Sequence, residues 1–297
     1  MMLHRNRTKP FGMANSEKVH FKGPDGKRLT GVLVTPKASA SKQIIIFVHG
    51  LWQHKNIAFL RKFGDGIPLD PAFHGMSTLR FDCRGLGESE GKTRYTPHYH
   101  NLEDLKCAVQ YAEDRGYTVH CIFGYSAGGN VAIMFAADDD SKVPYIVNSS
   151  GRFVMDQIEA TLGTDEAKAL QMDGKFIFKF TKRGQPQEVV STSQDIEQFK
   201  NISMQDYASR IPAKTRVLCT HGIADTRVPV EDTGGFVSEI ANASQILIPN
   251  CTHEYTQEVK DQSAMPVQDT LYEGFKRWIL GDADIRLSRR QLSFSKI

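Results

Sequence analysis

One serine of the chain lies in a setting that can turn a hydroxyl into a nucleophile. The pentapeptide Gly124–Gly128, which reads Gly-Tyr-Ser-Ala-Gly, follows the apolar run Val119–Phe123 and precedes a second apolar stretch that opens on Gly129. A strand, a sharp turn and a helix in this order predict a nucleophile elbow, which lifts the Ser126 hydroxyl above the edge of a sheet. The alternative is a glycine-rich surface turn, and the apolar flanks favour the elbow.

A nucleophilic serine needs a base within hydrogen-bond reach and an acid that orients this base. Behind an elbow the partners follow in the order Ser, Asp or Glu, His. Asp225 comes after a strand expected at 216–219, and His253 comes after the next one, expected at 245–248. Among the ten histidines, His253 alone meets both the order and the loop requirement. The sequence therefore predicts a set of Ser126, His253 and Asp225.

Other residues compete for the acid and base roles. Glu231 and Asp232 are the alternative acids, because they follow closely in the same part of the chain. His221 precedes the acid, and we expect it to pack at the end of its strand. His98 and His100 are expected in a polar connector, away from the chemistry.

Attack on a carbonyl also requires donors for the oxyanion that develops. The backbone N–H of Ala127, directly after the serine, is one candidate, and the loop His49–Trp52 should supply the second through the N–H of Leu51. Trp52 is a candidate for lining the acyl or alcohol pocket. Tyr125, beside the serine, is a further candidate for contact with the substrate.

Strand-like and helix-like runs alternate over most of the chain. The expected strands are 18–22, 29–34, 44–48, 76–82, 119–125, 145–148, 216–219 and 245–248, and helices are expected around 102–112, after the elbow and around 271–280. The first two strands read as an antiparallel pair, and the rest as βαβ units. The fold class is therefore α/β, with a mostly parallel central sheet flanked by helices and with ligands bound at the carboxyl ends of the strands.

One segment interrupts this alternation. Residues 152–209 contain amphipathic stretches, an aromatic run at 176–180 and a polar turn, and they are too long for a single crossover. We interpret them as an inserted cap over the site, with a pair of ordinary crossover helices as the alternative. The core is then 17–151 together with 210–282. The alternating Phe176, Phe178 and Phe180 are expected to form the interior of the cap rather than a cage for the ligand.

The two ends differ from the core in composition. Residues 1–16 are basic and predict a flexible extension, and residues 283–297 predict a flexible tail. The last three residues, Ser295, Lys296 and Ile297, differ from a peroxisomal address only at the final position. The expected location is the cytoplasm, with the peroxisome as the alternative.

Composition excludes several classes of function. The 297 residues are 40% hydrophobic and 24% charged, as in a soluble globular enzyme. The net charge is +3 with no basic face, which argues against a nucleic-acid partner, and no apolar run is long enough for stable insertion into a membrane. Neither a zinc spacing nor a disulfide framework connects the scattered cysteines, and we expect no metal and no cofactor. These cysteines are Cys83, Cys107, Cys121, Cys219 and Cys251.

Together the motifs resemble the α/β-hydrolase superfamily over about residues 18–282. Residues 49–52, 80–91 and 124–128 look like the branch of serine aminopeptidase-like proteins that includes cinnamoyl and feruloyl esterases. The resemblance implies the triad named above and an inserted cap at about 152–209. It also implies a structural role for the loop Asp82–Ser89.

The expected activity is cofactor-independent hydrolysis of a small-molecule carboxylic ester through an acyl-enzyme. The same triad serves amide or peptide cleavage and acyl transfer, so these remain alternatives. A non-catalytic ligand-binding protein on the same fold is less favoured, because such proteins often lose a member of the triad, and here all three residue types are present. The acyl group, the alcohol and the oligomeric state stay open.

Overall fold

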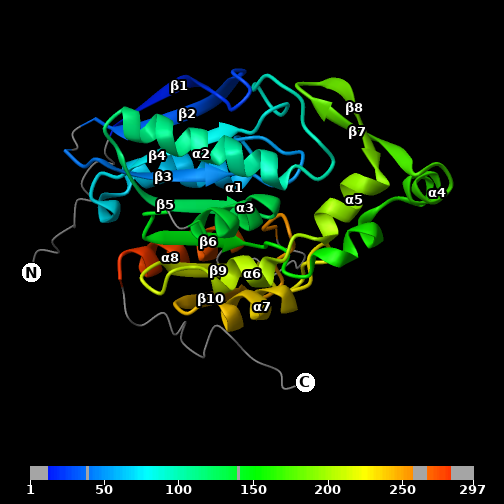
Figure 1. The fold of residues 1–297 in the computed structure, drawn as a ribbon. Coiled ribbons are helices and arrows are strands. Elements are labelled where there is room, and N and C mark those ends of the chain that lie inside the picture. The colour runs from blue at the N-terminus through cyan, green and yellow to red at the C-terminus, as the bar shows by residue number, and fades with distance from the viewer. Residues whose placement is uncertain (1–12, 38–39, 139–140, 257–265, 282–297) are drawn as a thin grey trace, which may run out of the picture.

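The computed structural model describes residues 13–37, 40–138, 141–256 and 266–281 (Figure 1). An eight-stranded sheet in the order β1-β2-β4-β3-β5-β6-β9-β10 runs through the molecule. β2 is antiparallel to both of its neighbours, and all other neighbours are parallel. The strands are β1 Ala14–Lys22, β2 Arg28–Pro36, β3 Gln43–Val48, β4 Ser77–Asp82, β5 Thr118–Tyr125, β6 Tyr145–Ser149, β9 Arg216–Gly222 and β10 Ala243–Ile248. The predicted α/β class and mostly parallel sheet are confirmed.

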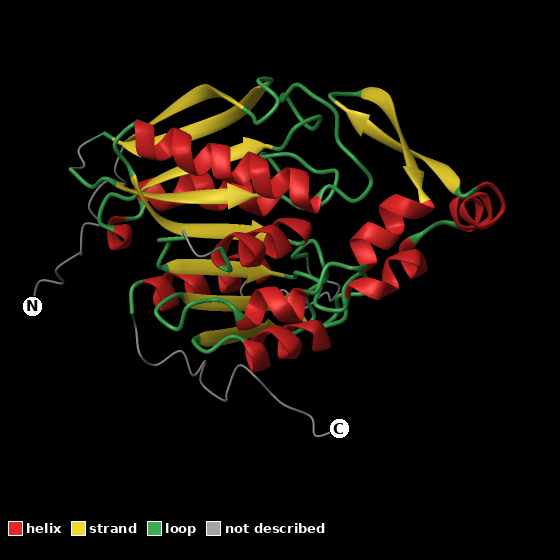
Figure 2. Cartoon of the chain, viewed as in Figure 1, coloured by secondary structure: helices red, strands yellow, loops and turns green. Residues whose placement is uncertain are grey.

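Helices cover both faces of this sheet (Figure 2). One face carries α1 (Ala58–Gly66) and α8 (Val267–Ile279), and the other carries α2 (His98–Asp114), α3 (Ala127–Ala136), α6 (Met204–Ser209) and α7 (Glu231–Glu239). α6 was expected in the insertion, but it packs against α3 and α7 of the core layer. Likewise β1 begins at Ala14, inside the segment expected to be a flexible extension.

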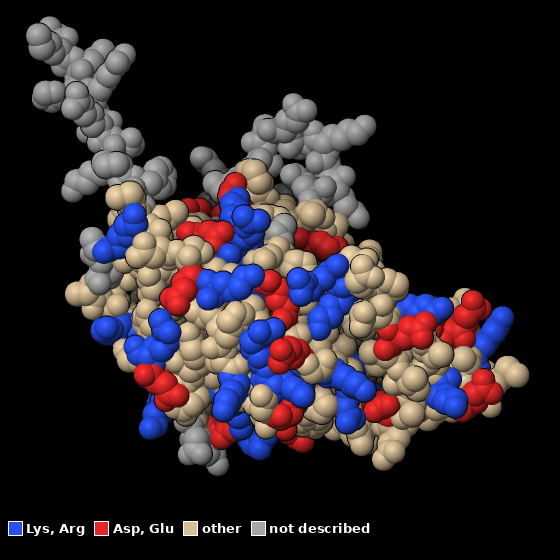
Figure 3. Space-filling view, turned by 90° about the horizontal axis from the view of Figure 1, so that it is seen from above, with Lys and Arg blue, Asp and Glu red and all other residues tan. Residues whose placement is uncertain are grey.

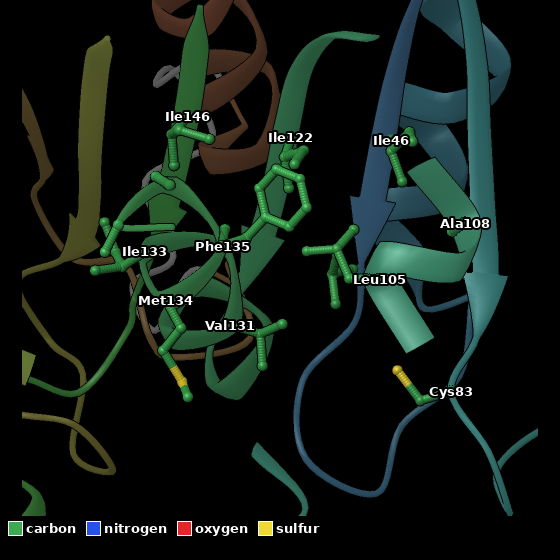
Figure 4. Close-up of a cluster of buried hydrophobic side chains, with 14 of the residues drawn as sticks. Ile46, Cys83, Leu105, Ala108, Ile122, Val131, Ile133, Met134, Phe135 and Ile146 are labelled. Atoms are coloured by element: carbon green, nitrogen blue, oxygen red, sulfur yellow. The ribbon is translucent and has the colours of Figure 1, made fainter. Parts of the chain in front are cut away.

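The strand β3 shows how the sequence builds two cores. Its side chains alternate between the faces, as in any strand. Ile44, Ile46 and Val48 join the cluster under α2 and α3, whereas Ile45 and Phe47 join the cluster under α1 and α8. Because both faces are covered by helices, the whole strand is apolar. Figure 4 shows the first cluster, in which residues of α2 and α3 meet those of β3, β5 and β6.

The chain between β6 and β9 leaves the layers of the sheet. A 3-10 segment (Met155–Thr161), α4 (Thr164–Asp173), the hairpin of β7 (Lys175–Lys182) and β8 (Gln185–Thr192), and α5 (Ser193–Lys200) lie beyond the carboxyl ends of the parallel strands (Figure 1). Arg183 and Gly184 both have positive φ, of 53° and 78°, as a tight two-residue hairpin turn requires. We call 152–203 the insertion.

On the face shown in Figure 3, basic and acidic side chains are interspersed, and neither sign of charge dominates. Within the described part of the chain, every helix is too short or too polar to cross a bilayer. The terminal tripeptide, the tail at 283–297 and most of the extension at 1–16 lie outside the described residues.

Candidate active site

The elbow forms where β5 passes into α3. Ser126 has a φ of 54°, which lies in the left-handed region. A Cβ on Gly124 would lie 2.0 Å from the carbonyl oxygen of Gly128, and a Cβ on Gly128 would lie 2.4 Å from that of Val48. Both glycines are therefore required by close backbone contact, and the turn they allow holds the serine at the carboxyl end of β5.

The structure brings the three predicted residues together. His253 Nε2 lies 3.0 Å from Ser126 Oγ, and His253 Nδ1 lies 2.6 Å from Asp225 Oδ2. β9 and β10 end at the same level, since Ile248 pairs with Gly222, so the loops that carry the acid and the base begin side by side. The N–H of Ala224 donates to the carbonyl of Cys251, which ties these two loops to each other.

Asp225 has hydrogen bonds on both carboxylate oxygens. Oδ1 accepts the backbone N–H groups of Arg227 and Val228, each at 2.9 Å, and Oδ2 accepts from His221 Nε2 at 3.0 Å as well as from His253. Burial alone would raise the pKa of Asp225, but the hydrogen bonds from His221 and His253 hold it below the ordinary value. The carboxylate is thus ionised and fixed in orientation.

His221 has a part in the site that the sequence did not reveal. Its Nε2 faces two acceptors, the Asp225 carboxylate and the carbonyl of Val228 at 3.1 Å, so this nitrogen carries the proton. Nδ1 then accepts from Thr233 Oγ1 at 2.8 Å. The side chain is fully buried and does pack at the end of β9, as expected, but it also positions the acid. Its place four residues before Asp225 was the available signal.

Tyr125 does not have the position expected of a substrate contact. Its side chain is 1% exposed, packs among the rings under α1, and is not part of the cavity lining described below. The hydroxyl donates to the carbonyl oxygen of His253 at 3.0 Å. Tyr125 therefore supports the backbone of the base from below, and its predicted role as a substrate contact is not compatible with this placement.

The alternative acids lie elsewhere. Asp232 accepts the N–H of Phe153 at 2.8 Å, so it anchors the start of the insertion to α7. Glu231 is exposed on the first turn of that helix. Within the described residues, only Asp225 among these three carboxylates contacts His253.

The oxyanion loop is held by His49. This fully buried ring lies 2.8 Å from the carbonyl of Gly50 through Nδ1, and its Nε2 accepts the N–H of Cys83 at 3.0 Å. Leu51 and Ala127 both line the cavity beside Ser126. Neither of their N–H groups donates to a loop or turn carbonyl within the described residues, so both amides are available to a ligand.

A cavity of about 580 Å³ opens over the serine, between the core and the insertion. Core loops contribute Leu51, Trp52, Arg227 and His253, and the insertion contributes Ile158, Leu162, Glu166, Phe178 and Phe199. Among the described residues, no group of three His, Cys, Asp or Glu side chains is arranged to hold a metal ion.

Four aromatic side chains line the cavity, and we call these residues, Trp52, Tyr95, Phe178 and Phe199, the aromatic wall. Trp52 stacks on Phe178 with ring centroids 3.8 Å apart and lies 4.8 Å from Tyr95. The cavity position predicted for Trp52 agrees with this placement. Phe178 was expected inside the cap, but it faces the cavity, because β7 turns alternate side chains toward the core.

His98 differs most from its expected place. It opens α2 instead of lying in a connector, and its ring, which is 3% exposed, lines the cavity 5.0 Å from the ring of Phe199. Burial lowers the pKa of His98 to about 4. No motif marks this residue, so only the fold could place it at the site.

The family model described as serine aminopeptidase, S33, matches residues 39–204, which is more than half of the chain. Among curated proteins, no sequence matches.

Several solved structures share the fold. Est1E from Butyrivibrio proteoclasticus, solved with ferulic acid bound, is 21% identical at a TM-score of 0.69, covering 88% of this chain and 98% of its own. The esterase domain of a Rhodothermus marinus protein is 18% identical at 0.62, covering 90% and 98%. The α/β hydrolase GrgF from Penicillium sp. sh18 is 18% identical at 0.63, covering 94% and 100%.

At these sequence identities the solved structures establish the fold, and the match to the family model establishes family membership. The chain therefore belongs to the serine aminopeptidase S33 family of α/β hydrolases.

Proposed function

We propose that the protein hydrolyses a carboxylic ester through an acyl-enzyme on Ser126. The observation that carries this proposal is the continuous chain of hydrogen bonds from Ser126 Oγ to His253 and from His253 to Asp225, at 3.0 and 2.6 Å. Nucleophile, base and orienting acid at such distances are the geometric signature of acyl transfer.

The proton positions follow from the partners. Asp225 is ionised, so it accepts from His253 Nδ1 and keeps the proton on that nitrogen. Nε2 is left with its lone pair toward Ser126 Oγ, as a general base requires. His253 takes the serine proton during attack and returns it to the departing alcohol. Water then enters, gives a proton to the same nitrogen and attacks the acyl carbonyl; the bond between the acyl carbon and Ser126 Oγ breaks, and Oγ takes that proton back as the acid leaves.

The oxyanion of each tetrahedral intermediate is assigned to the amides of Leu51 and Ala127. Both residues line the cavity next to Ser126, and Ala127 occupies the first turn of α3, where N–H groups have no partner within the helix. Two preorganised donors in a cavity of this kind stabilise negative charge far more than water does.

The cavity favours an ester with an apolar or aromatic part, because the aromatic wall lies beside the nucleophile. The ferulic acid held by the similar Est1E is one ligand of this kind. A starting panel is therefore a series of acyl chain lengths, a hydroxycinnamate ester and an aminoacyl amide.

The decisive comparison is the parent protein against Ser126→Ala on this panel. We expect the variant to fold with an unchanged melting temperature while ester turnover falls to background, a loss of at least about a millionfold in kcat at full sensitivity. Ser149→Ala is a matched control, since this buried serine ends the neighbouring strand β6 outside the cavity lining. Turnover retained by Ser126→Ala would refute the proposal.

The same geometry also serves amidases and acyltransferases. Faster turnover of the aminoacyl amide than of any ester would replace esterase by amidase. Preferential formation of a new ester when an alcohol is added would replace hydrolysis by transfer. Both outcomes keep Ser126 as the nucleophile.

A further inference from the structure

A buried imidazole in the cavity lacks the hydrogen bonds that its position demands. His98 Nδ1 is fully enclosed and has no partner, and no hydrogen bond to either ring nitrogen is found among the described residues. Leaving a buried polar group unsatisfied costs roughly 1–3 kcal/mol. Nδ1 is closed off by the protein, but Nε2 is not among the enclosed atoms and the ring lines the cavity, so a molecule bound there can supply a partner to Nε2.

A second unsatisfied group belongs to the aromatic wall. Trp52 Nε1 is buried and has no acceptor among the described residues, and the indole ring packs against Phe178 and Tyr95. Tryptophan N–H groups usually find a partner when they are buried. Because Trp52 Nε1 is enclosed, Trp52 presents its ring to the cavity, and the polar atom that a ligand can reach beside the aromatic wall is Nε2 of His98.

These groups define the chemistry of what they can bind. A neutral imidazole in this apolar setting supplies no charge to balance an ionised ligand group, and burying an unbalanced charge is costly, so a neutral polar group is favoured as its partner. The charged side chains of the lining, Arg152, Glu166 and Arg227, come from other elements than the aromatic wall. A hydroxyl both donates and accepts, which suits either tautomer of His98.

We propose that His98 determines specificity by binding a neutral hydroxyl group of the substrate, carried on a flat or apolar body that packs along the aromatic wall. This inference rests on the proposed esterase function and names the substrate feature that the same cavity selects. In the free protein, Nε2 of His98 has no partner among the described residues. In the complex, the substrate hydroxyl donates to Nε2 or accepts its N–H, depending on the tautomer, and this removes the cost of leaving Nε2 unsatisfied.

The test compares esters that differ only in the hydroxyl. The first pair is para-nitrophenyl 3-phenylpropanoate and para-nitrophenyl 3-(4-hydroxyphenyl)propanoate. The second pair is para-nitrophenyl hexanoate and para-nitrophenyl 6-hydroxyhexanoate. We expect the parent protein to prefer the hydroxylated member of at least one pair by roughly threefold to tenfold in kcat/KM. A preference in the first pair alone identifies an aromatic carrier, and in the second alone an aliphatic one.

Variants assign this preference to the imidazole. His98→Phe keeps the size and apolar packing of the ring, and we expect its ratio of kcat/KM for the hydroxylated over the unsubstituted ester to fall to about one. His98→Gln, which retains hydrogen-bonding atoms, should keep part of the preference. The control is His100→Phe, the same change two residues further on α2 and outside the cavity lining, which should leave the ratio unaltered.

A binding measurement keeps the inference independent of turnover. Ser126→Ala should bind para-ethylphenol more tightly than ethylbenzene, as seen by ligand-observed NMR, and Ser126→Ala/His98→Phe should bind both alike. If the parent protein shows no Ser126-dependent turnover of any ester but the binding preference is present, only the proposed function is refuted. The role of His98 would be overturned by equal kcat/KM and equal affinity for both members of every pair, or by a preference that His98→Phe retains.

Discussion

Two regions of the same cavity treat their polar atoms in opposite ways. At the proposed catalytic corner, formed by Ser126, His253, Asp225 and His221, side chains are hydrogen-bonded to one another in an unbroken chain. At the aromatic wall, by contrast, Trp52 Nε1 and both ring nitrogens of the adjoining His98 have no hydrogen-bond partner within the described part of the chain. The difference indicates that the chain itself fixes the groups that do chemistry, and leaves to the ligand the groups that recognise it.

The largest expected effect comes from breaking the catalytic corner at its acid. Asp225→Asn should lower kcat by about ten-thousandfold with little change in KM, because an amide N–H facing His253 Nδ1 favours the tautomer that cannot accept the serine proton. Steady-state kinetics on the best ester measures this. Asp232→Asn is the matched control, and a larger loss in that variant would move the acid role to Asp232.

A smaller effect is expected from removing the residue behind the acid. His221→Phe leaves Asp225 Oδ2 without one donor, so kcat should fall roughly tenfold to a hundredfold. KM should change little, because His221 lies outside the cavity lining. His221→Gln, which can still donate, should restore part of the activity. An unchanged kcat in His221→Phe, or a Gln variant no more active than the Phe variant, would reduce this residue to packing.

The burial of His98 beside the aromatic wall should also be visible in the pH dependence of stability. The folded pKa of His98, about 4, lies below the ordinary value, so the unfolded chain binds this proton first as the pH falls, and stability is lost from about pH 6.5 downward. Between pH 7 and pH 5 the free energy of unfolding of the parent should fall about 2 kcal/mol more than that of His98→Phe. Urea titrations at the two pH values measure this difference, and equal losses in the two proteins would mean that folding does not shift the pKa of His98.

The sequence predicted the catalytic corner better than the aromatic wall, for a physical reason. Gly124 and Gly128 are forced by backbone contact, and the carboxyl ends of parallel strands meet at one edge, so Asp225 and His253 could be located by strand order alone. These constraints are local or topological. They leave a trace in the order and spacing of the residues.

The aromatic wall is assembled from segments that no such constraint connects. Trp52 was found through its neighbour Leu51, but His98 reaches the cavity only because α2 runs back from that edge of the sheet. The strand β7 was not expected, although Phe176, Phe178 and Phe180 repeat every second residue and could have indicated it. Tyr125 was predicted to contact the substrate because it is adjacent to Ser126 in the sequence. It is the last residue of β5, and neighbouring side chains along a strand point to opposite faces, so adjacency did not place it in the cavity.

The central claim is that Ser126 Oγ forms the covalent bond to the substrate. The most direct measurement is intact-mass spectrometry after treatment with a fluorophosphonate, followed by peptide mapping. The account predicts one adduct, located on the peptide that contains Ser126, absent from Ser126→Ala, and strongly slowed in Asp225→Asn. An adduct on another residue, or full labelling of Ser126→Ala, would contradict it.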